Sequence, residues 1–168
     1  MRIYLIGFMG SGKTLRGREL SHKLKLPFFD LDEQVENSEG KTIPRIFAED
    51  GEEHFRHKET EVLHILTESH TSFVLACGGG APCFNNNIEY MNSSGVTAWL
   101  NPSIDSLFKR LLKERDQRPL LKGLSDNQLR GFILRKYSDR KIYYDQAKVI
   151  VDEEHMSIDS LIEKIFHA

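Results

Sequence analysis

The feature that most constrains this chain is a glycine-rich loop near its N-terminus. Residues 7–14 read Gly-Phe-Met-Gly-Ser-Gly-Lys-Thr and match the pattern GxxxxGK(S/T) in full. The loop follows a short apolar run at 3–6 and precedes a segment of helical period. Its glycines let the backbone N–H groups turn inward, and the start of the following helix adds a partial positive charge. This context predicts a site for the phosphates of a nucleoside triphosphate.

The predicted phosphate site assigns a role to each of two side chains of the loop, Lys13 and Thr14. Lys13 would neutralise the β and γ phosphates, and the Thr14 hydroxyl would ligate Mg²⁺. A glycine-rich turn that binds nothing is the alternative, but a match at four fixed positions argues against it. A dinucleotide-binding fingerprint is excluded because Leu15 stands where its third glycine should be.

Five short apolar runs alternate with longer segments of helical period, and this order is typical of βαβ units. The expected strands lie at 3–6, 28–31, 73–77, 96–100 and 148–151. The expected helices lie at 13–25, 52–69, 103–113, 125–144 and 157–166. The pattern predicts an α/β fold with a buried parallel sheet and helices on both of its faces.

Composition excludes several classes of protein. The chain has 168 residues and a formal net charge of -2, which fits one domain with no overall attraction to nucleic acid or acidic lipid. No apolar run approaches the roughly 20 residues of a membrane span, and Met1 leads straight into the first expected strand, so we expect no signal peptide. Cys77 and Cys83 match neither a disulfide framework nor a zinc site. We therefore expect a cytoplasmic protein, monomeric because no long apolar face signals self-association.

Two acidic residues follow the second expected strand. Alternation along that strand would put Asp30 and Asp32 on one side of its carboxyl end, where open α/β sheets bind ligands. One carboxylate could serve a metal ion and the other an acceptor hydroxyl. The alternative is that Asp32 caps the N-terminus of the next helix.

Two further groups point to an acceptor site. Arg56 and Glu59 lie one turn apart on a helix, where a surface ion pair is the alternative. Gly78, Gly79 and Gly80 directly follow a strand, and their missing Cβ atoms would let the backbone approach a ligand closely. A simple tight turn is the alternative for these glycines.

Residues 109–122 carry a local charge of +4 in an acidic chain. The segment contains two acidic residues, Glu114 and Asp116, and six basic ones. The basic residues are Lys109, Arg110, Lys113, Arg115, Arg118 and Lys122. A solvated helix end is one explanation. The other is a mobile lid at about 113–124, in which Arg118 reaches the transferring phosphate. Arg140, in the next helix, is spaced to face the same cleft.

Taken together, these residues resemble the shikimate kinase family of small P-loop kinases. The matching motifs are GFMGSGKT at 7–14, DLD at 30–32, IFAEDGEEHFRHKE at 46–59, GGG at 78–80, RPLL at 118–121 and RKIYY at 140–144. The resemblance implies a single domain over 1–168, built as a three-layer αβα sandwich with sheet order 2-3-1-4-5. It also implies phosphorylation of the 3-hydroxyl of shikimate by ATP, a step of chorismate and aromatic amino-acid biosynthesis. A helical segment at about 32–62 would bind shikimate.

The resemblance implies roles for individual residues as well. Asp32 would hold the accepting hydroxyl and take its proton, and Arg56 and Arg140 would grip the substrate carboxylate. Gly79, flanked by Gly78 and Gly80, would bind through its backbone. The catalytic set would be Asp32, Lys13 and Arg118, and Mg²⁺ would lie at Thr14 with Asp30 behind it. ATP would contact Gly10, Ser11, Gly12, Lys13, Thr14, Leu15, Arg110 near the adenine, and Arg118.

The chain departs from the family pattern at three points. Leu15 stands where a second hydroxyl is usual, so one contact to phosphate is expected to be missing. Cys77 replaces the usual Ser or Thr before the glycines, which places a thiol near the site. The lid segment is about one residue longer than is usual in the family.

Other functions remain as alternatives at this point. A GTPase-like switch would need DxxG and NKxD motifs, and the chain has neither. A gluconate or nucleoside monophosphate kinase would share the loop, but Arg56 with Arg140 predicts a carboxylated acceptor. His54, His57, Glu61 and His64 have the spacing of a helical metal site, although imidazoles on such a charged face are usually solvated.

Overall fold

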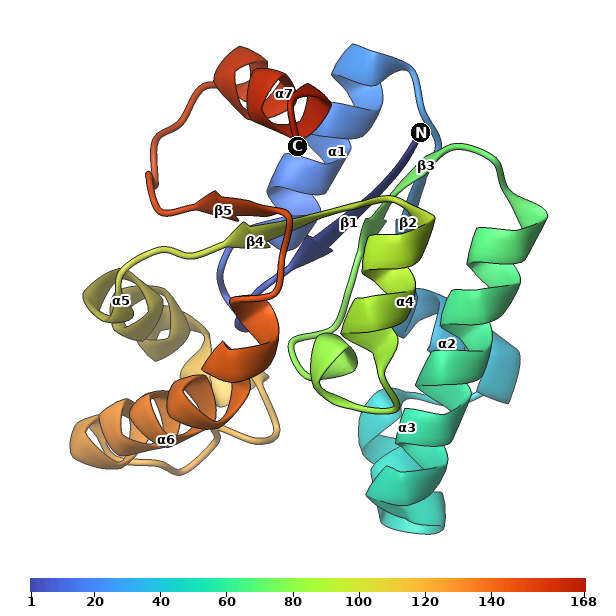
Figure 1. The fold of residues 1–168 in the computed structure, drawn as a ribbon. Helices are drawn as coiled ribbons and strands as arrows, with labels where there is room; N and C mark the ends of the chain where they lie inside the picture. Colours follow the sequence, from blue (N-terminus) through green and yellow to red (C-terminus); the bar gives the residue numbers. More distant parts are fainter.

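A five-stranded parallel sheet forms the centre of the computed structural model, which describes residues 1–168 (Figure 1). Its strands are β1 (Arg2–Ile6), β2 (Phe28–Asp30), β3 (Phe73–Ala76), β4 (Val96–Leu100) and β5 (Val149–Val151). Their order is β2-β3-β1-β4-β5, and in the central strand Leu5 pairs with Ala76 on one side and Ala98 on the other. The predicted parallel sheet and its order 2-3-1-4-5 are confirmed.

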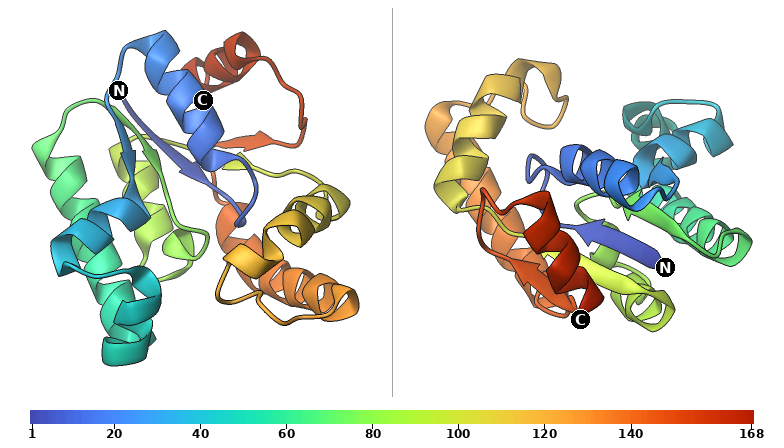
Figure 2. Two further views of the ribbon diagram at one scale, coloured as in Figure 1. Left: turned by 180° about the vertical axis from the view of Figure 1, so that it is seen from behind. Right: turned by 90° about the horizontal axis from the view of Figure 1, so that it is seen from above.

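The two faces of the sheet are covered by different helices, which completes the three predicted layers. In β1, Ile3 and Leu5 face a core shared with α1 (Lys13–Leu24) and α7 (Ile158–Phe166). Tyr4 and Ile6 face the opposite core, which is shared with α2 (Leu31–Glu39), α3 (Ile43–Ser69) and α4 (Asn87–Ser94). Figure 2 shows these two layers from behind and from above. Because both faces of the sheet centre are buried, the central strands are apolar without interruption over residues 3–6 and 73–76.

A third core fixes the phosphate-binding loop to the helices α5 (Ile104–Glu114) and α6 (Asp126–Tyr144). Phe8 of the loop is 1% exposed and packs among Leu107 and Leu111 of α5 and Leu129 of α6. A short 3-10 turn, η2 (Arg115–Gln117), leads out of α5. The buried Leu121 anchors the segment between the two helices to the same core.

Serine caps define the starts of α5, α6 and α7. The hydroxyls of Ser103, Ser125 and Ser157 each accept the backbone N–H of the residue three positions later. At Ser125 the Gln128 side chain also returns a bond to the capping residue, which completes a capping box. These three serines are the residues at which the sequence predicted the helices to begin.

The periodic pattern did not predict three helical segments, although the family resemblance implied a helical segment at about 32–62. They are α2, the first part of α3, and α4, which follows the short 3-10 turn η1 (Ala81–Cys83). The first part of α3 is separated from the rest by Gly51, whose φ of 87° and ψ of 166° are not helical. The periodic pattern is interrupted there, which explains why only the portion from Glu52 was predicted. No helix combines the length and the apolar character that crossing a membrane requires.

A substitution at Gly95 can test the close packing of β1 against the start of β4. A Cβ at Gly95 would lie 2.3 Å from the backbone carbonyl oxygen of Arg2. We expect Gly95→Ala to lower the free energy of unfolding by about 1–3 kcal/mol, because the two strands must separate to admit the methyl group. Urea unfolding followed by circular dichroism measures this change.

The matched control is Gly131→Ala in α6, where the nearest atom to a new Cβ is 3.9 Å away. This substitution should stabilise the protein by about 0.5–1 kcal/mol, because alanine is the better helix former. A Gly95→Ala variant as stable as the wild type would contradict the packing described for β1 and β4.

Candidate active site

The phosphate-binding loop connects β1 to α1 and leaves the start of that helix open. Gly12, immediately before α1, has a φ of 96°, and no side chain caps the helix. The first N–H groups of α1 therefore have no side-chain partner, and the helix dipole adds positive character at the same place. This is the local geometry that binds phosphate groups.

A cavity of about 800 Å³ runs along the loop at the carboxyl ends of the strands. Its lining includes every residue predicted to contact ATP, namely Gly10, Ser11, Gly12, Lys13, Thr14, Leu15, Arg110 and Arg118. Asp30, Asp32, Gly78 and Gly79 line the same cavity. The predicted metal-binding and nucleotide-binding residues therefore share one space with part of the predicted acceptor site.

Lys13 folds back onto its own loop. Its Nζ donates to the carbonyl oxygens of Gly7, at 2.5 Å, and Phe8, at 3.0 Å. Burial lowers the pKa of the ammonium to about 8, and the nearby Asp32 carboxylate opposes this shift. The lysine charge is thus held beside the loop at a cost in desolvation that a phosphate could offset.

The two acidic residues after β2 differ from the expectation in one respect. The strand ends at Asp30, and the Asp30 side chain caps α2 by accepting the Glu33 N–H at 3.2 Å. The alternative that Asp32 is the cap is wrong, because α2 begins at Leu31 and its cap is Asp30. Asp32 lies in the first turn of α2 instead, and burial raises the pKa of its carboxyl, with the Asp30 charge adding to the shift and Lys13 and Arg56 opposing it.

Each of the three glycines after β3 makes room for one predicted acceptor residue. A Cβ at Gly78 would lie 2.8 Å from Oδ1 of Asp32, and one at Gly79 would lie 2.9 Å from Nη1 of Arg140. A Cβ at Gly80 would lie 2.6 Å from Nη2 of Arg56. Side chains from α2, α6 and α3 therefore converge on this turn, and larger residues in it would displace them.

Arg56 is held from several sides. Its guanidinium pairs with Glu59 at 3.0 Å and stacks over the ring of Phe84, 4.2 Å from the ring centroid. Glu59 is fully buried, so the alternative of a surface ion pair is wrong. Phe84 was missed by sequence reasoning, since a single aromatic residue after the glycine turn carries no pattern.

Arg140 leaves one nitrogen without a partner. Its Nη1 atom is buried and makes no hydrogen bond within the protein, and the guanidinium lies 5.7 Å from the centroid of the Phe8 ring. Buried donors are almost always paired, because an unpaired one costs its desolvation energy. The arrangement suits an anionic group that would accept from this nitrogen.

Arg118 of the predicted lid segment and Arg110 of α5 both line the cavity, each with a partner of its own. Arg118 pairs with Glu114 at 2.8 Å and lines the cavity. Arg110 lines the cavity as well, and its Nη1 donates to the Gly10 carbonyl oxygen at 3.0 Å. Both guanidinium groups are therefore placed beside the phosphate-binding loop.

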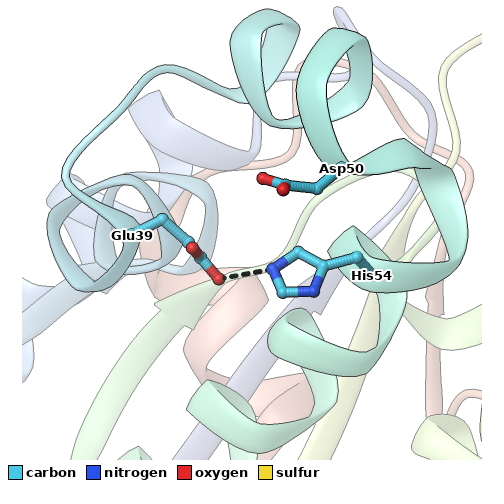
Figure 3. Close-up of side chains that lie close together, drawn as sticks. All are labelled: Glu39, Asp50 and His54. Carbon is cyan, nitrogen blue, oxygen red and sulfur yellow. Dashed lines mark hydrogen bonds and ion pairs between the residues drawn. The ribbon is translucent and has the colours of Figure 1, made fainter.

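A polar cluster joins α2 to α3 near Gly51 (Figure 3). His54 hydrogen-bonds to Glu39 at 2.9 Å, and Asp50 lies close to both. The carboxylate of Asp50 is paired with the Lys41 ammonium at 2.5 Å. The cluster therefore fixes the helix of Arg56 to the helix of Asp32.

The residues of the alternative helical metal site point to different partners. His64 stacks on Tyr90 with ring centroids 3.7 Å apart, and Glu61 pairs with Lys58 at 3.2 Å. His54 is bonded to Glu39, which that alternative did not include. The side chains do not meet around one point.

The two unusual residues of the site differ in their surroundings. Leu15 lines the cavity and is 66% exposed. Cys77 is buried with its sulfur 3.7 Å from the sulfur of Met91, and burial raises the pKa of the thiol well above its ordinary value. The thiol therefore stays protonated, and its reactivity is low.

The sheet order, the phosphate-binding loop and the converging acceptor side chains define a P-loop kinase of the small-molecule type. A profile of the shikimate kinase family matches residues 9–168. The chain is 42% identical to the shikimate kinase of Parabacteroides distasonis over 99% of this chain and 96% of that protein. It belongs to the shikimate kinase family.

Solved structures agree with this assignment. The crystal structure of shikimate kinase from Bacteroides thetaiotaomicron has a TM-score of 0.90 at 39% identity, with 99% of this chain and 97% of that chain covered. The Acinetobacter baumannii enzyme in complex with shikimate has a TM-score of 0.84 at 33% identity, with 99% and 90% covered. A gluconokinase from Sinorhizobium meliloti, at 16% identity and a TM-score of 0.53, shares the fold alone.

Glu59 predicts a specific pH dependence of stability. Burial raises its pKa from the ordinary 4.5 to about 7, although Arg56 opposes the shift. Between these two values only the unfolded chain is ionised, so the free energy of unfolding should fall as the pH rises through this window. The loss should be on the order of 3 kcal/mol, because one pKa unit corresponds to about 1.4 kcal/mol.

Glu59→Gln should lack this loss, so its unfolding free energy should depend less on pH between 4.5 and 8 than that of the wild type. Urea unfolding at several pH values measures the difference. Glu61→Gln, on the same helix with a side chain 46% exposed, is the matched control and should keep the wild-type profile. Parallel profiles for the wild type and Glu59→Gln would contradict the raised pKa.

Proposed function

We propose that this protein transfers the γ-phosphoryl group of ATP to the 3-hydroxyl of shikimate, giving shikimate 3-phosphate and ADP. The observation that carries the proposal is the glycine turn after β3, around which Asp32, Arg140 and Arg56 converge beside the phosphate-binding loop. Membership of the shikimate kinase family supports the same reaction. The reaction is a step of chorismate and aromatic amino-acid biosynthesis.

The acceptor would bind through charge-assisted hydrogen bonds. Arg56 and Arg140 would hold the carboxylate of shikimate, and the unpartnered Nη1 of Arg140 supports this role. Guanidinium groups bind carboxylates in a fixed geometry, which orients the whole ring of the acceptor. Gly79 would contribute its backbone, with Gly78 and Gly80 leaving space for the neighbouring side chains.

Asp32 would hold the 3-hydroxyl and accept its proton. It lines the same cavity as Lys13, so donor and acceptor can meet without crossing the protein. Burial raises the pKa of its carboxyl, which makes the carboxylate a somewhat stronger base than an exposed aspartate. A modest base suffices, because the transition state of phosphoryl transfer is loose and the main contribution of the protein is positioning.

ATP would lie with its phosphates on residues 10–15 and its γ-phosphate between Lys13 and Arg118. Mg²⁺ fits the donors present, because the Thr14 hydroxyl and the Asp30 carboxylate are hard oxygen ligands that line one cavity. When bound, Mg²⁺ supplies positive charge that neutralises the phosphate oxygens. Lys13 and Arg118 would orient the transferring group from the protein side.

Three further proposals concern the lid, the assembly and the compartment. Residues 113–124 would form a mobile lid hinged on the buried Leu121, and Arg118 would exchange Glu114 for phosphate as the lid closes. The protein would act as a monomer that binds no nucleic acid and no membrane. Two free cysteines fit a reducing compartment, which supports the cytoplasm.

The direct test of the proposed reaction compares acceptors by measuring ADP release with Mg-ATP. We expect turnover with shikimate and little with gluconate or AMP, because neither presents a carboxylate and a cyclic alcohol in the required arrangement. The methyl ester of shikimate keeps the hydroxyls but loses the charge. Its KM should be at least about 30-fold higher, since removing one partner of a buried charge pair costs about 2 kcal/mol or more. Equal use of shikimate and its ester would refute the role of the arginines.

Asp32→Asn tests the proposed proton acceptor. The amide is close in size to the carboxylate but cannot accept the proton as a base, so kcat should fall at least about 100-fold. ADP affinity, measured by calorimetry, should stay within about twofold because the phosphate-binding loop is untouched. Glu33→Gln, in the same first turn of α2, is the control and should keep wild-type activity. Unchanged turnover in Asp32→Asn would exclude the proposed role.

A further inference from the structure

Tyr144 lies where α6 meets the glycine turn. It is the last residue of α6 and fully buried, with its ring 5.4 Å from that of Trp99 in β4. Its hydroxyl donates to the carbonyl oxygen of Gly79 at 2.5 Å. Burial raises the pKa of the phenol well above its ordinary value, so the hydroxyl keeps the proton that it donates.

The Gly79 carbonyl has no hydrogen bond other than the one from Tyr144, whereas the carbonyls of Gly78 and Gly80 accept backbone N–H groups. The Gly78 carbonyl accepts the Ala81 N–H at 3.0 Å, and the Gly80 carbonyl accepts the Cys83 N–H at 3.0 Å. No backbone N–H reaches the carbonyl of Gly79, so the Tyr144 hydroxyl alone fixes the peptide plane between Gly79 and Gly80. Glycine peptides reorient easily, since they have no Cβ to restrain them.

The orientation of this peptide plane matters for the donors of the turn. The N–H groups of Gly79 and Gly80 form no backbone hydrogen bond, and Gly80 is buried. Because C=O and N–H point in opposite directions across a trans peptide, turning the Gly79 carbonyl toward Tyr144 turns the Gly80 N–H away from it. A buried N–H without a protein acceptor is suited to an oxygen of a ligand.

Tyr144 and Arg140 act on the same glycine from one helix. They are four residues apart, so they lie on one face of α6. Arg140 occupies the space that a Cβ of Gly79 would fill, and Tyr144 holds the carbonyl of that residue. One turn of α6 thus sets both the position of the guanidinium and the orientation of the adjoining peptide.

We infer that Tyr144 is a positioning residue for the acceptor: its hydroxyl locks the glycine turn so that Gly79, which lines the cavity, and the arginine beside it face the substrate. This inference rests on the proposed function, because it assigns Tyr144 to the binding of that same acceptor. Tyr144 touches no reacting atom and acts through Gly79.

Tyr144→Phe removes the hydroxyl and keeps the ring that packs against Trp99. The KM for shikimate should rise about 3–10-fold, the effect of losing one hydrogen bond, and kcat should fall with it. The KM for Mg-ATP should change less than about twofold, because the phosphate-binding loop is held by other contacts. A purely structural role would shift both KM values together or lower only the melting temperature. Tyr143→Phe, at the edge of the same core, is the matched control.

A second readout follows the turn itself in the protein without substrate. In protein labelled with ¹⁵N-glycine, the amide signals of Gly79 and Gly80 should move in Tyr144→Phe and stay in place in Tyr143→Phe. The inference is overturned if these signals do not move, or if the wild type phosphorylates shikimate and Tyr144→Phe has the kinetics of Tyr143→Phe. Failure of the proposed function would be visible differently, as wild-type protein that does not phosphorylate shikimate.

Discussion

The site depends on the close approach that three consecutive glycines permit at the end of β3. Parallel strands place their carboxyl ends at one edge, so the loops after β1, β2 and β3 necessarily come together there. Proximity of loops is not sufficient, because the side chains of Asp32, Arg140 and Arg56 occupy the space in which Cβ atoms of this turn would stand. Any larger residue in the turn would push an acceptor side chain away from the phosphate-binding loop.

Much of the fold could be predicted because its signals are local. Apolar runs, periodic segments and the serines at helix starts each depend on neighbouring residues, and the structure places the five strands and most helices where these signals indicate. The sheet order came from the family resemblance and not from these signals, and it is confirmed. The exceptions have local reasons as well. Gly51 divides α3, and the short α4 offers only two turns of pattern.

The interior of the site was less predictable, since it depends on contacts between distant segments. Sequence reasoning paired Arg56 with Glu59 but could not foresee that Glu59 is fully buried or that Phe84 lies under the guanidinium. The bond from Tyr144 to Gly79 spans 65 residues and has no spacing signal. The sequence offered Asp32 as a possible helix cap, whereas Asp30 caps α2, because strand and helix ends are the positions that sequence patterns define least sharply.

The lysines and the arginines of the cationic segment at residues 109–122 have different surroundings. Its three lysines are exposed and solvated. Its arginines instead take fixed partners: Arg110 the loop carbonyl of Gly10, Arg115 the Asp126 carboxylate, and Arg118 the Glu114 carboxylate. This division follows the chemistry of the side chains, because the planar guanidinium forms directional bonds whereas the ammonium is more strongly hydrated.

The ionisable groups of the site share one electrostatic property. Burial lowers the pKa of Lys13 and raises the pKa values of Asp32 and Glu59, so the protein disfavours the charged form of each. A core built only for stability would avoid such groups. A triphosphate beside Lys13 and a carboxylate beside Arg140 would give these two cations anionic partners. The buried cations therefore lower the stability of the protein without ligands. The same cations can bind the phosphates and the carboxylate more strongly, because little water competes for them.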